Sequence, residues 1–111
     1  MGYSRAVRVG NVVEVAGTTA QDGDLISGGD EYTQAKRILE KIATALHEAG
    51  ATLQQVVRTR IFVTNIASWE AVGRAHGEVF GQIWPASTMV QVAALIDARL
   101  LVELEATAII A

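Results

Sequence analysis

The chain has 111 residues, a formal net charge of −3 and no cysteine. This length is that of one compact domain spanning residues 1–111, and the lack of thiols excludes disulfides, thiol catalysis and cysteine-based metal centres. The nine basic residues are scattered, and the aromatic residues are two each of Trp, Tyr and Phe, so the composition argues against nucleic-acid binding. Because the chain has no signal-peptide pattern and no apolar run near the ~18 residues of a membrane span, we expect a soluble, cytoplasmic protein with no membrane partner.

The N-terminal segment is predicted to form a β-hairpin. Residues 7–9 lead into a turn signal at residues 10–11, and residues 12–16 then read as a strand that breaks at Gly17. A second turn is predicted at residues 21–24, where Asp and Gly cluster.

A helix beginning at Asp30 is the clearest element of the sequence. Asp30 is an N-cap candidate, and Gly50 stands where a residue with a left-handed backbone ends a helix. Between them, apolar residues recur at spacings of three and four, which predicts one buried face. These residues are Tyr32, Ala35, Ile38, Leu39, Ile42, Ala45, Leu46 and Ala49.

A strand is predicted for residues 56–64, after a capping-box pattern formed by Thr52 and Gln55. Its residues are β-branched and aromatic, as is typical of strands. Strict alternation assigns the side chains to two faces: Val57, Thr59, Ile61 and Val63 on one, and Arg58, Arg60 and Phe62 on the other.

A second amphipathic helix is predicted from about residue 67 to residue 80. His76 lies on its apolar stripe, so a packed and hydrogen-bonded ring is favoured over a catalytic one. Pro85 precedes a strand expected over residues 87–95, and a last strand is expected over residues 100–110. The stripe consists of Trp69, Val72, His76, Val79 and Phe80.

The order of elements, ββ(β)αβαββ, predicts an α+β two-layer sandwich with both helices on one face of a sheet. Hydrophobic residues make up 50% of the chain and charged residues only 19%. A domain of this size has a high ratio of surface to volume, so we expect the surplus apolar residues to be buried in an obligate homo-oligomer.

The last strand decides which groups lie on the face away from the helices. Alternation predicts that Glu103 and Glu105 share that face, roughly 7 Å apart, with Glu14 and Arg58 or Arg60 as possible neighbours. The two carboxylates are interpreted either as a solvated, salt-bridged surface or as a general acid–base site, since burial would shift a carboxyl pKa toward that use. The opposite, core-facing set is Val102, Leu104, Ala106, Ala108 and Ile110.

Metal and nucleotide motifs are absent from the sequence. Its two histidines lack the HExxH spacing, so no metal site is expected. Gly28 and Gly29 do not follow a strand in the GxGxxG arrangement, so they are read as a loop and not as a dinucleotide cradle.

Eight short segments, in their order and spacing, resemble the RidA/YjgF (Rid) superfamily over nearly the whole chain. The resemblance implies a chorismate-mutase-like fold assembled as a homotrimer with a central barrel, and ligand pockets in the clefts between subunits. Archetypal members hydrolyse reactive imines or enamines to a 2-keto acid and ammonia and need no cofactor, and some members carry an endoribonuclease L-PSP label. The segments are Gly2-Tyr3-Ser4, Val9-Gly10-Asn11, Ala16-Gly17, Gly28-Gly29-Asp30, Thr59-Arg60-Ile61-Phe62-Val63, Pro85-Ala86-Ser87-Thr88, Val90-Gln91-Val92-Ala93 and Val102-Glu103-Leu104-Glu105-Ala106.

The resemblance implies roles for several pocket residues. Glu103 matches the catalytic glutamate that positions a water, and Tyr3 matches the N-terminal pocket tyrosine. Ala16, before Gly17, replaces the serine that the family has there, and Gly73 replaces a helix asparagine. The water-activating half of the pocket is therefore expected to be kept.

The carboxylate-binding half departs from the family pattern. The family has an arginine after the Pro-Ala pair, where it would bind a substrate carboxylate bidentately, and this chain has Ser87. The resemblance adds Thr88 to the ligand-binding set, and it assigns to Met89 the backbone N–H that meets the carboxylate. A hydroxyl supplies no charge, so carboxylate capture is weakened unless another cation replaces the arginine. The candidates are Arg58, Arg60 and Arg74.

Two functions follow from these residues. The first is a deaminase-like hydrolase with Glu103 as general acid–base, acting on a small metabolite other than the usual 2-imino acids. The second is a non-catalytic, trimeric small-molecule binding protein, as the replacements at Ser87, Ala16 and Gly73 would allow. A nucleic-acid role is disfavoured by the acidic balance. Packing is favoured over pocket lining for Trp84.

Overall fold

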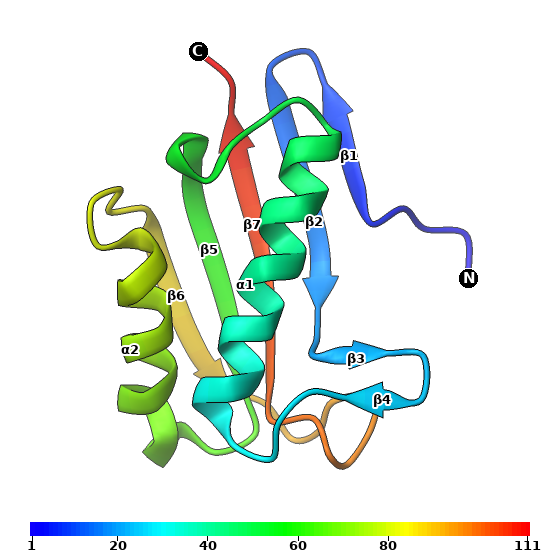
Figure 1. Cartoon of the computed structure of the whole chain (residues 1–111), viewed down its shortest axis with the longest axis vertical. Coiled ribbons are helices and arrows are strands. Elements are labelled where there is room, and N and C mark those ends of the chain that lie inside the picture. Colours follow the sequence, from blue (N-terminus) through cyan, green and yellow to red (C-terminus); the bar gives the residue numbers. More distant parts are fainter.

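A mixed five-stranded sheet forms one of the two layers of the computed structural model, which describes residues 1–111 (Figure 1). The strand order is β1-β2-β7-β5-β6, and every neighbouring pair is antiparallel except β5 and β6. A short separate hairpin, β3-β4, follows β2. The strands are β1 (Ala6–Val9), β2 (Val12–Thr18), β3 (Gln21–Asp22), β4 (Leu25–Ile26), β5 (Val56–Val63), β6 (Ala86–Gln91) and β7 (Val102–Ile109).

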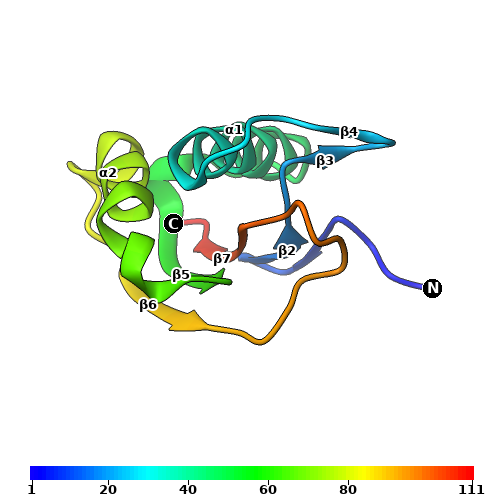
Figure 2. The ribbon, with the colours of Figure 1, turned by 90° about the horizontal axis from the view of Figure 1, so that it is seen from below.

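The second layer consists of α1 (Glu31–Glu48) and α2 (Trp69–Phe80), which lie on the same face of the sheet (Figure 2). Short 3₁₀ helices at Leu53–Gln55 and Ile66–Ser68 precede β5 and α2. The core lies between the layers, where buried side chains of both helices and the inward residues of β2, β5 and β7 form one cluster. The predicted two-layer α+β fold is confirmed.

Local signals define the ends of α1 as predicted. The Asp30 carboxylate accepts a hydrogen bond from the backbone N–H of Thr33 at 2.8 Å, which satisfies one of the free donors of the first turn. At the other end, Gly50 has φ +86°, a conformation that a residue without Cβ adopts at little cost. The helix therefore spans the predicted residues.

Strand β5 corrects the predicted alternation at Val57. Val56 pairs with Ala108 and Arg58 with Thr107, so Val57 is the extra residue of a bulge. Val57 is accordingly exposed, and Val56 takes the inward position that alternation assigned to Val57. A bulge depends on the partner strand, and strict period-two reasoning cannot locate it.

The second helix and the strand after it also differ from expectation. Trp69 is 55% exposed, because it lies in the first turn, and a periodic pattern gives a residue's face but not how far the covering layer extends. The strand expected over residues 87–95 ends at Gln91. The last strand begins at Val102 and keeps its predicted alternation throughout.

No helix covers the other face of the sheet (Figure 2). Strand pairing places charged and apolar side chains there together, among them an ion pair between Arg60 and Glu105 at 3.6 Å. Glu14 accepts a hydrogen bond from Thr107 on the same face. The salt-bridged interpretation therefore fits Glu105. The exposed apolar residues of this face are Val7, Val9, Val12, Val90 and Ile109.

Candidate functional site

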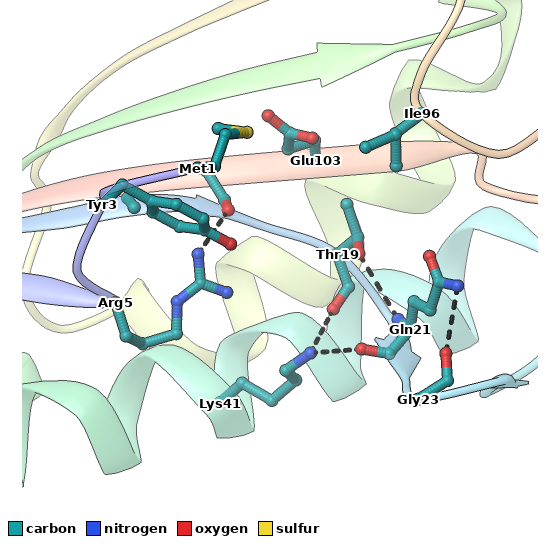
Figure 3. A pocket seen from close by; sticks show the side chains of 11 residues that line it. Met1, Tyr3, Arg5, Thr19, Gln21, Gly23, Lys41, Ile96 and Glu103 are labelled. Carbon is teal, nitrogen blue, oxygen red and sulfur yellow. Dashed lines mark hydrogen bonds between the residues drawn. The ribbon is translucent and has the colours of Figure 1, made fainter.

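A pocket of about 560 Å³ lies beside the N-terminal segment and the end of β2 (Figure 3). It brings together four residues that the sequence assigned to one site: Tyr3, Ala16, Gly17 and Glu103. Tyr3 comes from the segment before β1, the next two from β2 and Glu103 from β7. Because β2 and β7 are paired neighbours, the sheet itself positions the glutamate against the glycine.

Glu103 is half-buried although it points away from the core. A Cβ built on Gly17 would overlap the Glu103 carboxylate oxygen Oε2, so a side chain at position 17 would displace that carboxylate. Burial is the largest cause that raises the pKa of Glu103, and the charge of Glu105 raises it further, while Arg5 opposes both. Glu103 therefore stays protonated to a higher pH than an ordinary glutamate, as general acid–base catalysis requires.

Arg5 is a pocket cation that the sequence interpretation missed. Its Nη2 donates to the carbonyl oxygen of Gly17 at 2.8 Å, and its guanidinium lies 5.7 Å from the centre of the Tyr3 ring. Residues two apart on an extended segment share a side, so the spacing from Tyr3 to Arg5 was the available signal.

The other cation of the pocket, Lys41, is held by the fold. Its Nζ donates to the carbonyl oxygens of Thr19 and Gln21 at 2.7 and 2.8 Å and lies 3.4 Å from the Asp22 carboxylate. These contacts tie the chain after β2 to α1 (Figure 3). Among the basic residues of the pocket, Arg5 is thus the one without a carboxylate partner.

The remaining predicted ligand residues lie elsewhere in the chain. Ser87, Thr88 and Met89 are on β6, at the opposite edge of the sheet from β1, and Gly73 is on α2 (Figure 1). None of the four lines the Glu103 pocket. One chain therefore carries the two halves of the predicted site at separate places.

The three arginines considered as replacements have different partners. Arg58 Nη2 donates to the Thr88 hydroxyl at 2.6 Å, one residue from Ser87. Arg60 pairs with Glu105, and Arg74 lies over the Tyr32 ring at 4.3 Å. Arg58 is thus the cation that the fold brings next to the ligand segment of β6.

His76 and Trp84 are now placed. His76 packs against Phe80 with 4.7 Å between ring centres, and its Nε2 hydrogen-bonds the Thr59 hydroxyl, which confirms the predicted satisfied ring. The packing favoured for Trp84 is wrong within the chain. Its backbone is left-handed, with φ 59°, and its side chain is 84% exposed, because the turn after α2 carries the indole away from the core.

No group of three or more His, Asp or Glu side chains could hold a metal ion. Neither helix combines the length and the apolar character needed to cross a membrane.

The fold and the pocket define a small α+β protein whose sheet holds a half-buried glutamate against a glycine of the neighbouring strand. Residues 1–110 match the family described as endoribonuclease L-PSP. The chain therefore belongs to this family, that of the RidA/YjgF proteins.

Individual relatives cover most of the chain. It is 33% identical to the human 2-iminobutanoate/2-iminopropanoate deaminase, over 96% of this chain and 79% of the relative. It is 32% identical to the 3-aminoacrylate deaminase RutC of Acinetobacter baylyi, over 96% and 85%. A crystal structure of a YjgF/YER057c/UK114 family member from Mycobacterium tuberculosis is similar, with a TM-score of 0.91, 51% identity and coverage of 98% and 87%.

Proposed function

We propose that this protein is a deaminase-like hydrolase that acts on a small imine or enamine in clefts between subunits of a homotrimer. The observation that carries the proposal is Glu103, a half-buried carboxyl with a raised pKa that lies against Gly17 in an open pocket. Relatives named as imine and aminoacrylate deaminases support the same chemistry.

Glu103 would act as general base and then as general acid. Its carboxylate takes a proton from a water whose oxygen forms a bond to the imine carbon. The carboxylic acid returns that proton to the nitrogen, which gives a carbinolamine. The hydroxyl proton of the carbinolamine then passes through Glu103 to the nitrogen, the carbon–oxygen double bond forms as the carbon–nitrogen bond breaks, and ammonia leaves a carbonyl product. No net proton or electron is gained by the protein, so one carboxyl with a pKa nearer to neutrality suffices. Arg5, beside the Gly17 carbonyl, adds a positive charge to the same pocket.

The substrate is expected to differ from the usual 2-imino acids. At the position where the family has its carboxylate-binding arginine, this chain offers the Ser87 hydroxyl, and β6 carries no charged residue. Arg58, on the neighbouring strand β5, contacts Thr88, whose side chain alternates to the face of the sheet opposite to that of Ser87. The same observation favours the second candidate, a non-catalytic trimeric protein that binds a small metabolite.

A trimer would bring the two halves of the site together. The Glu103 pocket and the Ser87–Met89 segment lie at different edges of the sheet, and the uncovered sheet face exposes apolar side chains that a second copy could bury. We expect a sedimentation mass of three times the 11.8 kDa chain mass. A monomer mass at micromolar concentration would contradict the inter-subunit cleft.

Imine hydrolysis can be tested with 2-iminobutanoate, generated in place by a threonine dehydratase. We expect the wild type to accelerate its loss weakly and Ser87→Arg to accelerate it about tenfold more, since a charged hydrogen bond adds roughly 1.5–3 kcal/mol over none. Ser87→Lys is the matched control, because it adds the charge without the planar fork and should gain less. If none of the three proteins exceeds the spontaneous rate, the non-catalytic binding function is favoured.

A further inference from the structure

A hydrogen-bonded series of three polar side chains connects the helix layer with the edge of the sheet. His76 Nε2 lies 2.9 Å from the Thr59 hydroxyl, and this hydroxyl lies 2.8 Å from Ser87 Oγ. The three residues come from α2, β5 and β6, and the parallel register that pairs Thr59 with Ser87 brings them together. Thr59 is fully buried, whereas Ser87 is exposed.

The hydroxyl of Thr59, in the middle of this series, fixes the direction of both hydrogen bonds. Thr59 has one proton, so it donates to one neighbour and accepts from the other. When His76 carries a proton on Nε2, His76 donates to Thr59 and Thr59 donates to Ser87, which leaves the Ser87 proton free to point outward. When Nε2 is unprotonated, the order reverses, and Ser87 offers only lone pairs to the outside.

We propose that His76 and Thr59 are positioning residues that set whether Ser87 donates or accepts a hydrogen bond toward the ligand. Protonation of His76 fixes Ser87 as a donor suited to a carboxylate, and the neutral ring allows Ser87 to accept from an amino or hydroxyl group. The inference rests on the proposed function in one respect, namely that Ser87 contacts the ligand.

The hydrogen bond to Thr59 is the main polar contact of His76. Burial lowers the pKa of His76, so the ring is neutral near pH 7 and becomes charged only at a lower pH than an ordinary histidine does. The charged residues of α2 other than Glu70 are engaged with α1: Arg74 lies over Tyr32, and Glu78 binds Lys36 and Tyr32.

The strands packed against His76 add no charge on its side. On β5, the neighbours Arg58 and Arg60 alternate to the other face of the sheet, where they contact Thr88 and Glu105. Strand β6 has no charged residue. Protonation of His76 therefore acts on Ser87 through Thr59.

The test uses propanoate as a carboxylate probe and NMR of the labelled full chain. Binding is followed at the Ser87 backbone amide at about pH 5 and about pH 7.5, and His76 ionisation is followed on its ring. We expect wild-type affinity for ionised propanoate, corrected for the fraction of the acid that is protonated near pH 5, to be about fivefold higher at the lower pH, because a hydrogen bond backed by a charge is stronger than a neutral one. The midpoint should coincide with the His76 titration.

Variants show whether the pH dependence of propanoate binding passes through the Thr59 hydroxyl or comes from the charge of His76 acting at a distance. Thr59→Val removes the shared hydroxyl and should abolish the pH dependence, Thr59→Ser should restore it, and Thr44→Val, which removes an exposed hydroxyl of α1, should not change it. All are made in a Glu103→Gln background, so that titration of Glu103 does not contribute.

Three results would overturn the inference: an unchanged pH dependence in Thr59→Val, a midpoint that does not follow His76, or no saturable propanoate binding at the lower pH. Failure of the proposed function is separate. A wild type that hydrolyses no imine, but whose propanoate affinity follows His76 through Thr59, keeps the positioning role and loses the catalytic one.

Discussion

Glu103→Gln is expected to slow hydrolysis of 2-iminobutanoate about 10²- to 10⁴-fold, the usual contribution of a general acid–base group. Glutamine keeps the size and the hydrogen-bonding reach of the side chain, but it cannot take a proton from water and return it to nitrogen. The measurement is the rate of imine loss in the Ser87→Arg background, where the signal is expected to be largest. The proposed trimer should stay intact in this variant, because Glu103 belongs to the pocket and not to the core.

Glu105→Gln is the matched control, because Glu105 lies two residues away on the same strand and pairs with Arg60 outside the pocket. It should retain most of the activity. Equal losses from both variants would indicate a general effect of the charged sheet face and would contradict the role assigned to Glu103.

The pH dependence of the same variant has a defined sign. Because burial raises the pKa of Glu103 above its ordinary value of 4.5, the folded state binds its proton more tightly than the unfolded state does. The contribution of the Glu103 proton to the stability of the wild type is fully present below the unfolded-state pKa. It is lost as the pH rises through the raised pKa of the folded state. The free energy of unfolding of Glu103→Gln minus that of the wild type should therefore be larger at neutral pH than at about pH 4. Urea unfolding of both proteins at the two pH values measures this difference.

Gln34→Ala is expected to have the largest effect on stability, a loss of about 3 kcal/mol or more in the free energy of unfolding. Gln34 is fully buried on α1, and its amide connects two loops. Its Nε2 donates to the carbonyl oxygens of Gly28 and Arg99 at 3.1 and 3.0 Å, and its Oε1 accepts from the Leu101 N–H at 2.9 Å. Truncation leaves these backbone groups without partners and opens a cavity.

Urea unfolding measures this loss as a lower midpoint with an unchanged slope. Gln34→Leu separates the two causes, because it fills most of the volume and still leaves the three backbone groups unpaired. Gln82→Ala removes an exposed glutamine and should change the free energy of unfolding by about 0.5 kcal/mol or less. A loss below about 1 kcal/mol for Gln34→Ala would show that water replaces the missing bonds.

The fold could be predicted wherever its signals are local. Asp30 and Gly50 end α1 through contacts within a few residues, and β7 alternates strictly because both of its neighbours are strands. Features that depend on a partner strand were predicted wrongly. The bulge at Val57 depends on β7, and the early end of β6 depends on how far β5 continues beside it.

The candidate site divides in the same way. Residue pattern and family resemblance pointed to Glu103, and the structure places it with Tyr3 and Gly17 as that resemblance implied. Arg5 was counted among scattered cations, because its role depends on where the N-terminal segment lies. The connection from His76 to Ser87 was missed, because hydrogen bonds between residues 17 and 28 apart in sequence have no local signature.

By itself, the sequence determined the order of the two helices and of the five strands of the main sheet, the ends of the first helix, the face of each last-strand residue and the family. The first three of these properties depend on backbone preferences and periodicity within short windows, whereas the family followed from a resemblance of motifs in their order along nearly the whole chain. Only the tertiary structure decided which cation enters the Glu103 pocket, that Gly17 must lack a side chain there, and that Thr59 links His76 to Ser87. Such contacts follow from strand order and register, which side-chain period alone does not specify.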